Sequence, residues 1–267
     1  VGDNTNNGIE ILTAPVDDSA AVKKICTGAD AVIVVAGTTY KDEGEYIGNG
    51  KIRDKQNPDK GNFMTRTGIL GLGGDRKYLH LHQPDIDAIH TASSVNKNVA
   101  VVLVAGSAIT VEEWHQEVPA ILQTFYNGME GGTALARILF GDVNPSGKLP
   151  FTVPKLESDL PPFNSFEANA GYGYYHGYTL FDKVVGADTN HEPRYSFGFG
   201  LSYTQFEISD LKTWQVSETC HVSISVKNTG ARAGAEVVQV YVGLPDSKID
   251  RPEKLLRAFK KVFLQPG

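Results

Sequence analysis

The 267-residue sequence contains few cysteines and tryptophans and lacks long apolar or basic runs. Its two cysteines, Cys26 and Cys220, are too few for a disulfide framework, and both lie in apolar patterns, so we expect two buried free thiols. No apolar stretch reaches the length of a membrane span, which argues against a membrane protein. The net charge of −6 and the scattered basic residues disfavour binding to nucleic acid or to an anionic membrane.

Strand and helix patterns alternate along the first two hundred residues. Residues 31–36, AVIVVA, and residues 99–105, VAVVLVA, are continuous apolar runs typical of strands buried on both faces of a parallel sheet. Between these runs, Ile86, Ile89 and Val95 recur at near-helical spacing. The alternation predicts a layered α/β domain. The other elements that we expect in it are a short helix capped by residues 17–19 that ends near Gly28, a strand over residues 120–126 and a helix that begins near Glu130.

The pattern changes after Gly200. Residues 220–226 alternate between apolar and polar side chains, which is typical of a half-buried antiparallel strand. We therefore predict an α/β domain over residues 1–200, followed by an all-β domain over residues 201–267.

Both predicted domains are expected to be incomplete. The 64 residues from 204 to 267 are fewer than the roughly 100 residues of a fibronectin-like β-sandwich. At the other end, the first convincing sheet strand already follows a helix, so we expect the first strand of the α/β domain to be missing.

An acidic cluster follows the first predicted strand directly. Asp42, Glu43 and Glu45 lie in the string YKDEGEYIGNG, just after the apolar run at 31–36. Ligand sites of open α/β sheets lie outside the carboxyl ends of the strands, and neighbouring carboxyls raise one another's pKa. The cluster is therefore a candidate for a general acid. The alternative is a solvated acidic loop, since most charge runs are solvated.

Two other motifs do not support a cofactor site. GLGGD at 71–75 does not join a strand to a helix in the way that a dinucleotide-binding loop requires. HLH at 80–82 has no further metal ligands at a recognisable spacing, so its histidines are expected to make local hydrogen bonds.

Several strings of the sequence resemble the C-terminal half of family 3 glycoside hydrolases of the β-glucosidase type. The strings occur in the family's order and span most of the chain. They are GGDRKYLHL at 73–81, VPAILQTFYNGMEGGTALARILFGDVNPSGKLPFTVP at 118–154, YSFGFGLSYTQFE at 195–207, VKNTGARAGAEVVQVYVGLP at 226–245 and RPEKLLRAFKKVFLQPG at 251–267.

The resemblance implies a fold and a division of catalytic labour. Family members combine a (β/α)8 barrel with an α/β sandwich domain and a fibronectin-III-like domain. This chain would contain most of the second part and the beginning of the third. The nucleophilic aspartate would lie in a complementary barrel domain or chain, which this sequence does not contain.

The resemblance also implies a retaining exo-β-glycosidase and identifies its acid/base. Many fungal members carry a GEGY-like string after the same strand, and here GEY aligns Glu45 with the acid/base glutamate of that string. Because the string is one glycine shorter, Glu43 remains the competitor. The substrates implied are β-linked glucosides or oligosaccharides, without a metal or organic cofactor. A secreted or periplasmic location is favoured over a cytoplasmic one.

The segment from Asn49 to Leu72 is longer than the corresponding loop in many relatives. It is expected either to reach over the sugar site or to form a plain surface loop. The candidates for substrate binding are Asp42, Tyr46, Arg53 and Phe63.

Two alternatives to a β-glucosidase stay open. A β-xylosidase or another exo-β-glycosidase of the family fits equally, because sugar choice resides largely in the barrel. A noncatalytic carbohydrate-binding or scaffold module is the other alternative. Such a module favours an exposed aromatic platform, and neither Trp114 nor Trp214 begins a clear one.

Overall fold

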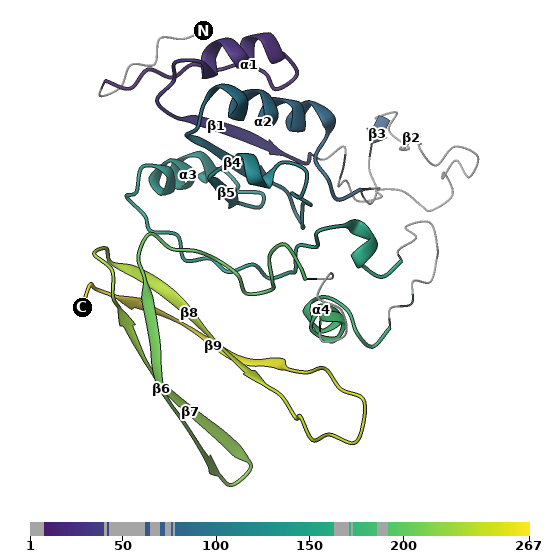
Figure 1. The fold of residues 1–267 in the computed structure, drawn as a ribbon, viewed down its shortest axis with the longest axis vertical. Coiled ribbons are helices and arrows are strands. Elements are labelled where there is room, and N and C mark those ends of the chain that lie inside the picture. The colour runs from purple at the N-terminus through teal and green to yellow at the C-terminus, as the bar shows by residue number, and fades with distance from the viewer. Residues whose placement is uncertain are drawn as a thin grey trace. The chain divides into compact units, whose positions relative to one another are not determined.

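The computed structural model of the chain divides into two compact units, which are drawn in Figure 1. The first unit comprises Val1–Gly128 with Val153–Gly171, and the second comprises Met129–Thr152 with Tyr172–Gly267. The structure describes residues 8–39, 42, 62–64, 70–72, 76, 78–162, 171, 173–185 and 192–267, with backbone alone for 62–64, 70–72, 184 and 185.

A three-stranded parallel sheet forms the centre of the first unit (Figure 1). Its strands are β1 (Val32–Gly37), β4 (Val99–Val104) and β5 (Ala120–Gln123), in the order β1-β4-β5. Val34 pairs with Val101 across β1 and β4. All three strands agree with the sequence prediction, so the predicted α/β class is confirmed.

Two helices accompany this sheet. α1 (Ser19–Cys26) begins after Asp18, whose side chain accepts a hydrogen bond from Ala21 N, as an N-cap does. α2 (Gln83–Val95) has a proline in its first turn, and it contacts both β1 and β4. Ile86 and Ile89 of α2 are 2% and 0% exposed, which confirms the helical spacing read from the sequence.

The two long strands of the sheet differ in burial. In β4, Val101 and Val102 face opposite sides and are both fully buried, as predicted. In β1, Val34 is buried, whereas Ile33 and Val35 are 43% and 53% exposed. The prediction that β1 is buried on both faces is therefore wrong for one face, because among the described residues only the face that carries Val34 packs into the core.

The second unit contains two antiparallel strand pairs (Figure 1). β6 (Phe206–Val216) pairs with β7 (Thr219–Asn228), and β8 (Gly234–Val242) pairs with β9 (Leu255–Leu264). These pairs confirm the predicted change to all-β structure.

Cys220 lies on β7 and is exposed, so the expectation of two buried thiols is wrong for this residue. In the region around it, β7 pairs with β6 alone, so alternation along the strand does not by itself produce a buried face. Cys26 is buried as expected, and burial raises the pKa of its thiol.

Asn228, at the end of β7, is 1% exposed and links both strand pairs. Its Nδ2 donates to the carbonyls of Arg232 and Leu264, and its Oδ1 accepts from Thr204 Oγ1 and Gly230 N. This buried amide therefore satisfies backbone and side-chain groups from several segments of the second unit.

The remaining elements of the described chain are short. They are β2 (Asn62–Met64), β3 (Leu70–Leu72), η1 (His115–Glu117), α3 (Gly131–Leu139), η2 (Glu157–Asp159) and α4 (Tyr178–Val185). The structure describes no helix that is both long and apolar enough to cross a membrane.

Candidate active site at the carboxyl end of the parallel sheet

β1 ends at Gly37, where the backbone passes very close to β4. Its φ of 152° lies in a region that favours glycine, and a Cβ added there would meet the carbonyl oxygen of Val104 at 2.0 Å. The next residue, Thr38, donates its backbone N–H to the same carbonyl at 2.9 Å. Gly37 therefore allows the chain to leave the sheet close to the end of β4.

Thr38 also connects the ends of two strands that are not neighbours in the sheet. Its Oγ1 lies 2.9 Å from the hydroxyl of Tyr126, which follows β5. Thr38 is 8% exposed and Tyr126 is 52% exposed. The contact therefore places a tyrosine ring at the open carboxyl edge, above the end of β4.

Asp42, the first member of the acidic cluster, is held by several hydrogen bonds. Its Oδ2 accepts from the backbone N–H of Thr39 at 2.8 Å and from the Thr39 hydroxyl at 3.0 Å. Its Oδ1 lies 2.7 Å from Nε2 of His82, the residue that precedes α2. Both oxygens of Asp42 thus bind groups of the chain itself, and its role in substrate binding stays a prediction.

These contacts shift the pKa of Asp42. Burial raises the pKa of this carboxyl, but the hydrogen bonds from Thr39 and His82 and the charge of His82 outweigh burial. The pKa of Asp42 therefore lies below its ordinary value, and this carboxyl is ionised at neutral pH. Asp42 is unsuited to the role of a proton donor.

Asp85, in the first turn of α2, has the opposite shift. It is 9% exposed, and burial raises the pKa of its carboxyl. The positive charge of His82 and a hydrogen bond from the backbone of Gly37 oppose the shift, while the charge of Asp42 adds to it. The charge of His82 thus acts on two carboxyl groups whose pKa values are shifted in opposite directions.

Arg76 contacts the loop that follows β4. Its guanidinium donates to the hydroxyl of Ser107 and to the carbonyl of Ala108. This contact ties the segment before α2 to the same edge of the sheet.

The predicted acid/base and most of the predicted sugar-binding residues lie outside the described residues. These are Glu45, its competitor Glu43, Tyr46 and Arg53, and of Phe63 only the backbone, in β2, is described. The assignments to these residues therefore stay predictions. The contact between Asp42 and His82, which the sequence reading missed, fixes where the acidic segment begins.

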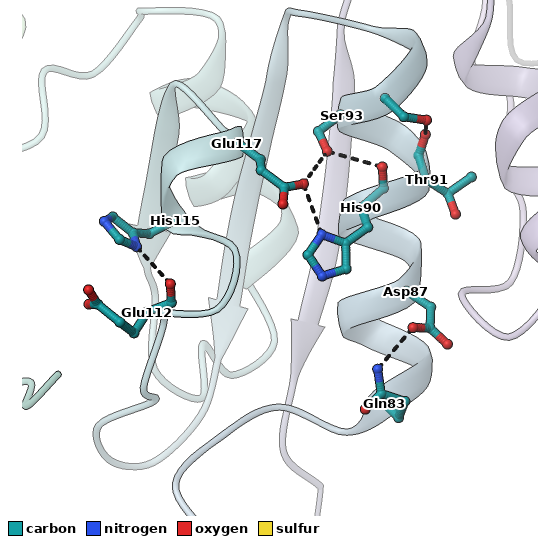
Figure 2. A network of polar contacts seen from close by, with 9 residues as sticks. Gln83, Asp87, His90, Thr91, Ser93, Glu112, His115 and Glu117 are labelled. Atoms are coloured by element: carbon teal, nitrogen blue, oxygen red, sulfur yellow. Dashed lines mark hydrogen bonds and ion pairs between the residues drawn. The ribbon is translucent and has the colours of Figure 1, made fainter. Parts of the chain in front are cut away.

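A second polar network lies on the exposed side of α2 (Figure 2). Glu117 Oε2 lies 2.8 Å from His90 Nδ1 and accepts a hydrogen bond from Ser93 Oγ at 2.9 Å. The bond with His90 lowers the pKa of Glu117, and burial opposes it. Both side chains of the His90–Glu117 pair are well exposed, 38% and 41%, and their contact ties η1 to α2.

The described residues contain no group of three or more His, Cys, Asp or Glu side chains arranged to hold a metal ion. His80 makes the expected local contact, with Nδ1 2.8 Å from the carbonyl of Leu81. The expectation of a local hydrogen bond is wrong for His82, which contacts Asp42, a residue far away in sequence.

The chain contains a parallel sheet with polar residues at its carboxyl edge, and antiparallel strands follow this sheet in the sequence. This order is that of an α/β domain followed by a fibronectin-like domain. The model of the glycosyl hydrolase family 3 C-terminal domain matches residues 4–203, and that of the fibronectin type III-like domain matches residues 236–267. The chain belongs to glycosyl hydrolase family 3. The domain boundary between residues 200 and 201 stays a prediction.

Two similar proteins are named as β-glucosidases. The chain is 39% identical over 256 residues to thermostable beta-glucosidase B of Acetivibrio thermocellus, and the match covers 90% of this chain and 33% of that protein. It is 39% identical over 209 residues to probable beta-glucosidase I of Aspergillus niger, covering 73% of this chain and 25% of that protein.

Two solved structures that are similar to this chain also have titles that name glucoside-hydrolysing enzymes. The beta-D-glucoside glucohydrolase of Trichoderma reesei matches with a TM-score of 0.76 at 29% identity, over 94% of this chain and 35% of that one. Beta-glucosidase 3B of Thermotoga neapolitana, in complex with α-D-glucose, matches with a TM-score of 0.73 at 32% identity, over 99% of this chain and 34% of that one. The chain thus spans about a third or less of the length of these relatives.

Proposed function

We propose that this chain is the part of a retaining exo-β-glycosidase, specifically a β-glucosidase, that supplies the general acid/base. The acid/base is Glu45, and the nucleophilic aspartate belongs to a (β/α)8 barrel domain or chain that acts with this one. The single observation that carries the proposal is the anchoring of Asp42 at the carboxyl edge of the sheet, in a chain of family 3.

The proposed chemistry needs two carboxyl groups about 5–5.5 Å apart. The barrel aspartate attacks the anomeric carbon while Glu45 transfers its proton to the departing glycosidic oxygen. Glu45 then removes a proton from the water that attacks the glycosyl-enzyme, which releases the sugar with its configuration retained.

The contacts of Asp42 support this assignment through its neighbours in sequence. Asp42 lies three residues before Glu45 and is fixed to Thr39 and His82, so the acidic segment starts from a defined point at the edge of the sheet. The lowered pKa of Asp42 keeps a negative charge three residues before Glu45 in the sequence. A neighbouring negative charge raises the pKa of a second carboxyl, which a proton donor at neutral pH requires.

A pair of variants in the enzyme assembled with its barrel tests the proposal. Glu45→Ala should slow hydrolysis of disaccharides by roughly 10²–10⁴-fold, because their poor leaving groups need a proton. The rate at which dinitrophenyl glycosides glycosylate the enzyme should change little, because their leaving groups need little protonation. Added azide should restore turnover and give a β-glycosyl azide, because azide needs no general base.

Glu43→Ala is the matched control. It should show neither the leaving-group dependence nor the rescue by azide, and only a modest shift of the pH profile from the loss of a nearby charge. If the azide product forms with the Glu43 variant instead, the two roles are exchanged. If neither variant responds, the acid/base lies elsewhere and the proposal fails.

A further inference from the structure

His82 joins the start of the acidic segment to α2. Of the hydrogen bonds that the structure describes for Asp42, those with Thr39 are local in sequence, whereas the one with Nε2 of His82, at 2.7 Å, spans 40 residues. An ionised carboxylate can only accept a hydrogen bond, so Nε2–H of His82 is the donor. The first described residue of the acidic cluster is therefore held to α2 by one imidazole.

The backbone of His82 is fixed on both sides. Leu81, which precedes it, is 1% exposed. The carbonyl of His82 accepts hydrogen bonds from the backbone N–H groups of Asp85 and Ile86, at 3.0 and 3.2 Å, as the N-cap residue of α2. The imidazole therefore extends from a backbone position that a buried side chain and a helix define.

The first turn of α2 is also attached to the end of β1. Asp85, in this turn, is 9% exposed, and its carboxyl accepts a hydrogen bond from the backbone of Gly37, the last residue of β1. The chain that leaves β1 is thus held to the start of α2 at two points, at Gly37 through Asp85 and at Asp42 through His82.

The exposure of the His82–Asp42 pair indicates what the contact contributes. The side chain of His82 is 61% exposed and that of Asp42 is 16% exposed. Exposed ion pairs contribute little to stability, so the first unit should keep its fold without this contact. Proton transfer, in contrast, needs the donor within hydrogen-bond distance of the acceptor, and a small displacement of a catalytic group slows a reaction greatly. A contact that is weak for folding can therefore be important for catalysis.

We propose that His82 is a positioning residue of the glycosidase, which fixes the start of the segment that carries the acid/base through its hydrogen bond to Asp42. It acts through Asp42 and not by contact with the substrate. The inference rests on the proposed function, in which Glu45, three residues after Asp42, transfers the proton. Loss of the imidazole should therefore impair the steps that need this proton and leave the attack by the nucleophile unaffected.

Steady-state kinetics of the enzyme assembled with its barrel test the role of His82. His82→Ala should lower kcat for disaccharides about tenfold with little change in KM, which is less than the roughly 10²–10⁴-fold loss expected without the acid/base itself. The rate at which dinitrophenyl glycosides glycosylate the enzyme should change little. His82→Gln should restore most of the rate, because its amide nitrogen lies as many bonds from Cβ as Nε2 of histidine does and can donate to Asp42.

His80→Ala is the matched control. It removes an exposed imidazole of the same HLH string, whose Nδ1 contacts the carbonyl of the adjacent Leu81, and its kinetics should equal those of the native enzyme. A double-mutant cycle tests the route of the effect. His82→Ala added to Asp42→Ala should cause little further loss, whereas a further tenfold loss would mean that His82 does not act through Asp42 and would overturn the proposal.

A measurement on the turn itself separates this proposal from the assignment of Glu45. The N–H groups of Thr39 and Asp42 form hydrogen bonds with each other's residue, so their amide exchange should be faster in the His82→Ala chain at a nearly unchanged melting temperature. Unchanged exchange, a clear drop in melting temperature or native disaccharide turnover overturns the proposal, even where Glu45→Ala shows rescue by azide. Absence of that rescue overturns the proposed function, and amide exchange then still decides whether His82 holds the segment.

Discussion

Strand β4 of the first unit and strand β6 of the second contain similar apolar side chains, but their burial differs greatly. Val99, Val101 and Val102 of β4 are 1% exposed or less. Ile208 and Leu211 of β6 are 54% and 70% exposed. An apolar side chain in a strand is buried only where another layer covers it, and a two-stranded pair alone has little stability.

The two units therefore depend on different interactions. In the first unit, apolar contacts between the sheet and α2 form the core. In the second, the buried apolar residues include Phe181, Ala235 and Val238, while the buried amide of Asn228 joins the strand pairs. We expect the first unit to be the more resistant to local unfolding.

An Ile→Ala substitution made in each unit should give the largest difference in the free energy of unfolding. Ile89→Ala removes a side chain that is 0% exposed and should lower the free energy of unfolding by about 2–5 kcal/mol. Ile208→Ala removes one that is 54% exposed and should cost about 1 kcal/mol or less. Urea unfolding, with hydrogen exchange to locate the effect, measures both, and equal losses would contradict the comparison.

The buried Asn228 of the second unit should contribute more to the free energy of unfolding than the exposed Asn98 of the first. Asn228→Ala leaves several buried groups without partners and should cost about 2 kcal/mol or more. Asn98→Ala, at an exposed position where Nδ2 donates to Asp30 O, should cost about 1 kcal/mol or less. If the two variants unfold at the same urea concentration, Asn228 does not join the strand pairs as described.

The lowered pKa of Asp42 predicts how stability depends on pH. The folded pKa lies below the unfolded value of about 3.9, so ionised Asp42 stabilises the fold above that pH. The contribution is lost as pH falls through the folded pKa. The difference in unfolding free energy between the native chain and Asp42→Asn should be about 1 kcal/mol or less, since His82 is 61% exposed, and should shrink below about pH 4.

Asp85→Asn is the control with the opposite sign. Burial raises the folded pKa of Asp85, so its ionisation disfavours the fold at neutral pH. The stability of the native chain relative to this variant should therefore increase as pH falls. The two quantities to compare are the differences in unfolding free energy between the native chain and Asp42→Asn and between the native chain and Asp85→Asn. If both change in the same direction with pH, the description of the carboxylates around His82 is wrong.

The last of these predictions concerns the titration of a tyrosine of the second unit and no change in stability. The hydrogen bond from the Tyr175 hydroxyl to Asp250, at 2.6 Å, raises the pKa of Tyr175 to about 12. Phenolate absorbance is recorded against pH for the native chain and for Tyr175→Phe. The difference between the two curves gives the titration of Tyr175 alone. Asp250→Asn should bring the pKa back towards about 10, with Lys183, which lies over the ring, unchanged. An unchanged pKa would exclude the bond as its cause.

Much of the first unit could be predicted from the sequence because its elements are strongly periodic. The apolar spacing of Ile86 and Ile89 indicated α2, and the run at 99–105 indicated β4. Burial was harder to predict: the pattern of Ile33 and Val35 is that of a buried strand, but the pattern does not show whether another layer covers their face of the sheet. Alternation along β7 likewise did not reveal that Cys220 is exposed.

The candidate site could be predicted only in part. The acidic cluster was found because it follows directly on a strand. The contacts that hold it join residues far apart in sequence, such as Asp42 with His82 and Thr38 with Tyr126, and no local pattern indicates which hydroxyl or imidazole will meet which carboxylate. Register and loop path decide these contacts.

Hydrolysis of an aryl β-glucoside by the purified chain, alone and mixed with a barrel-containing chain, tests the proposed function most directly. One carboxyl group cannot be both nucleophile and acid/base in the same step, so the chain alone should give no enzymatic turnover. Addition of the barrel should restore turnover, and a barrel mixed with the Glu45→Ala chain should need azide for it. Robust hydrolysis by the rigorously purified chain alone would contradict the proposal that the nucleophile comes from the barrel.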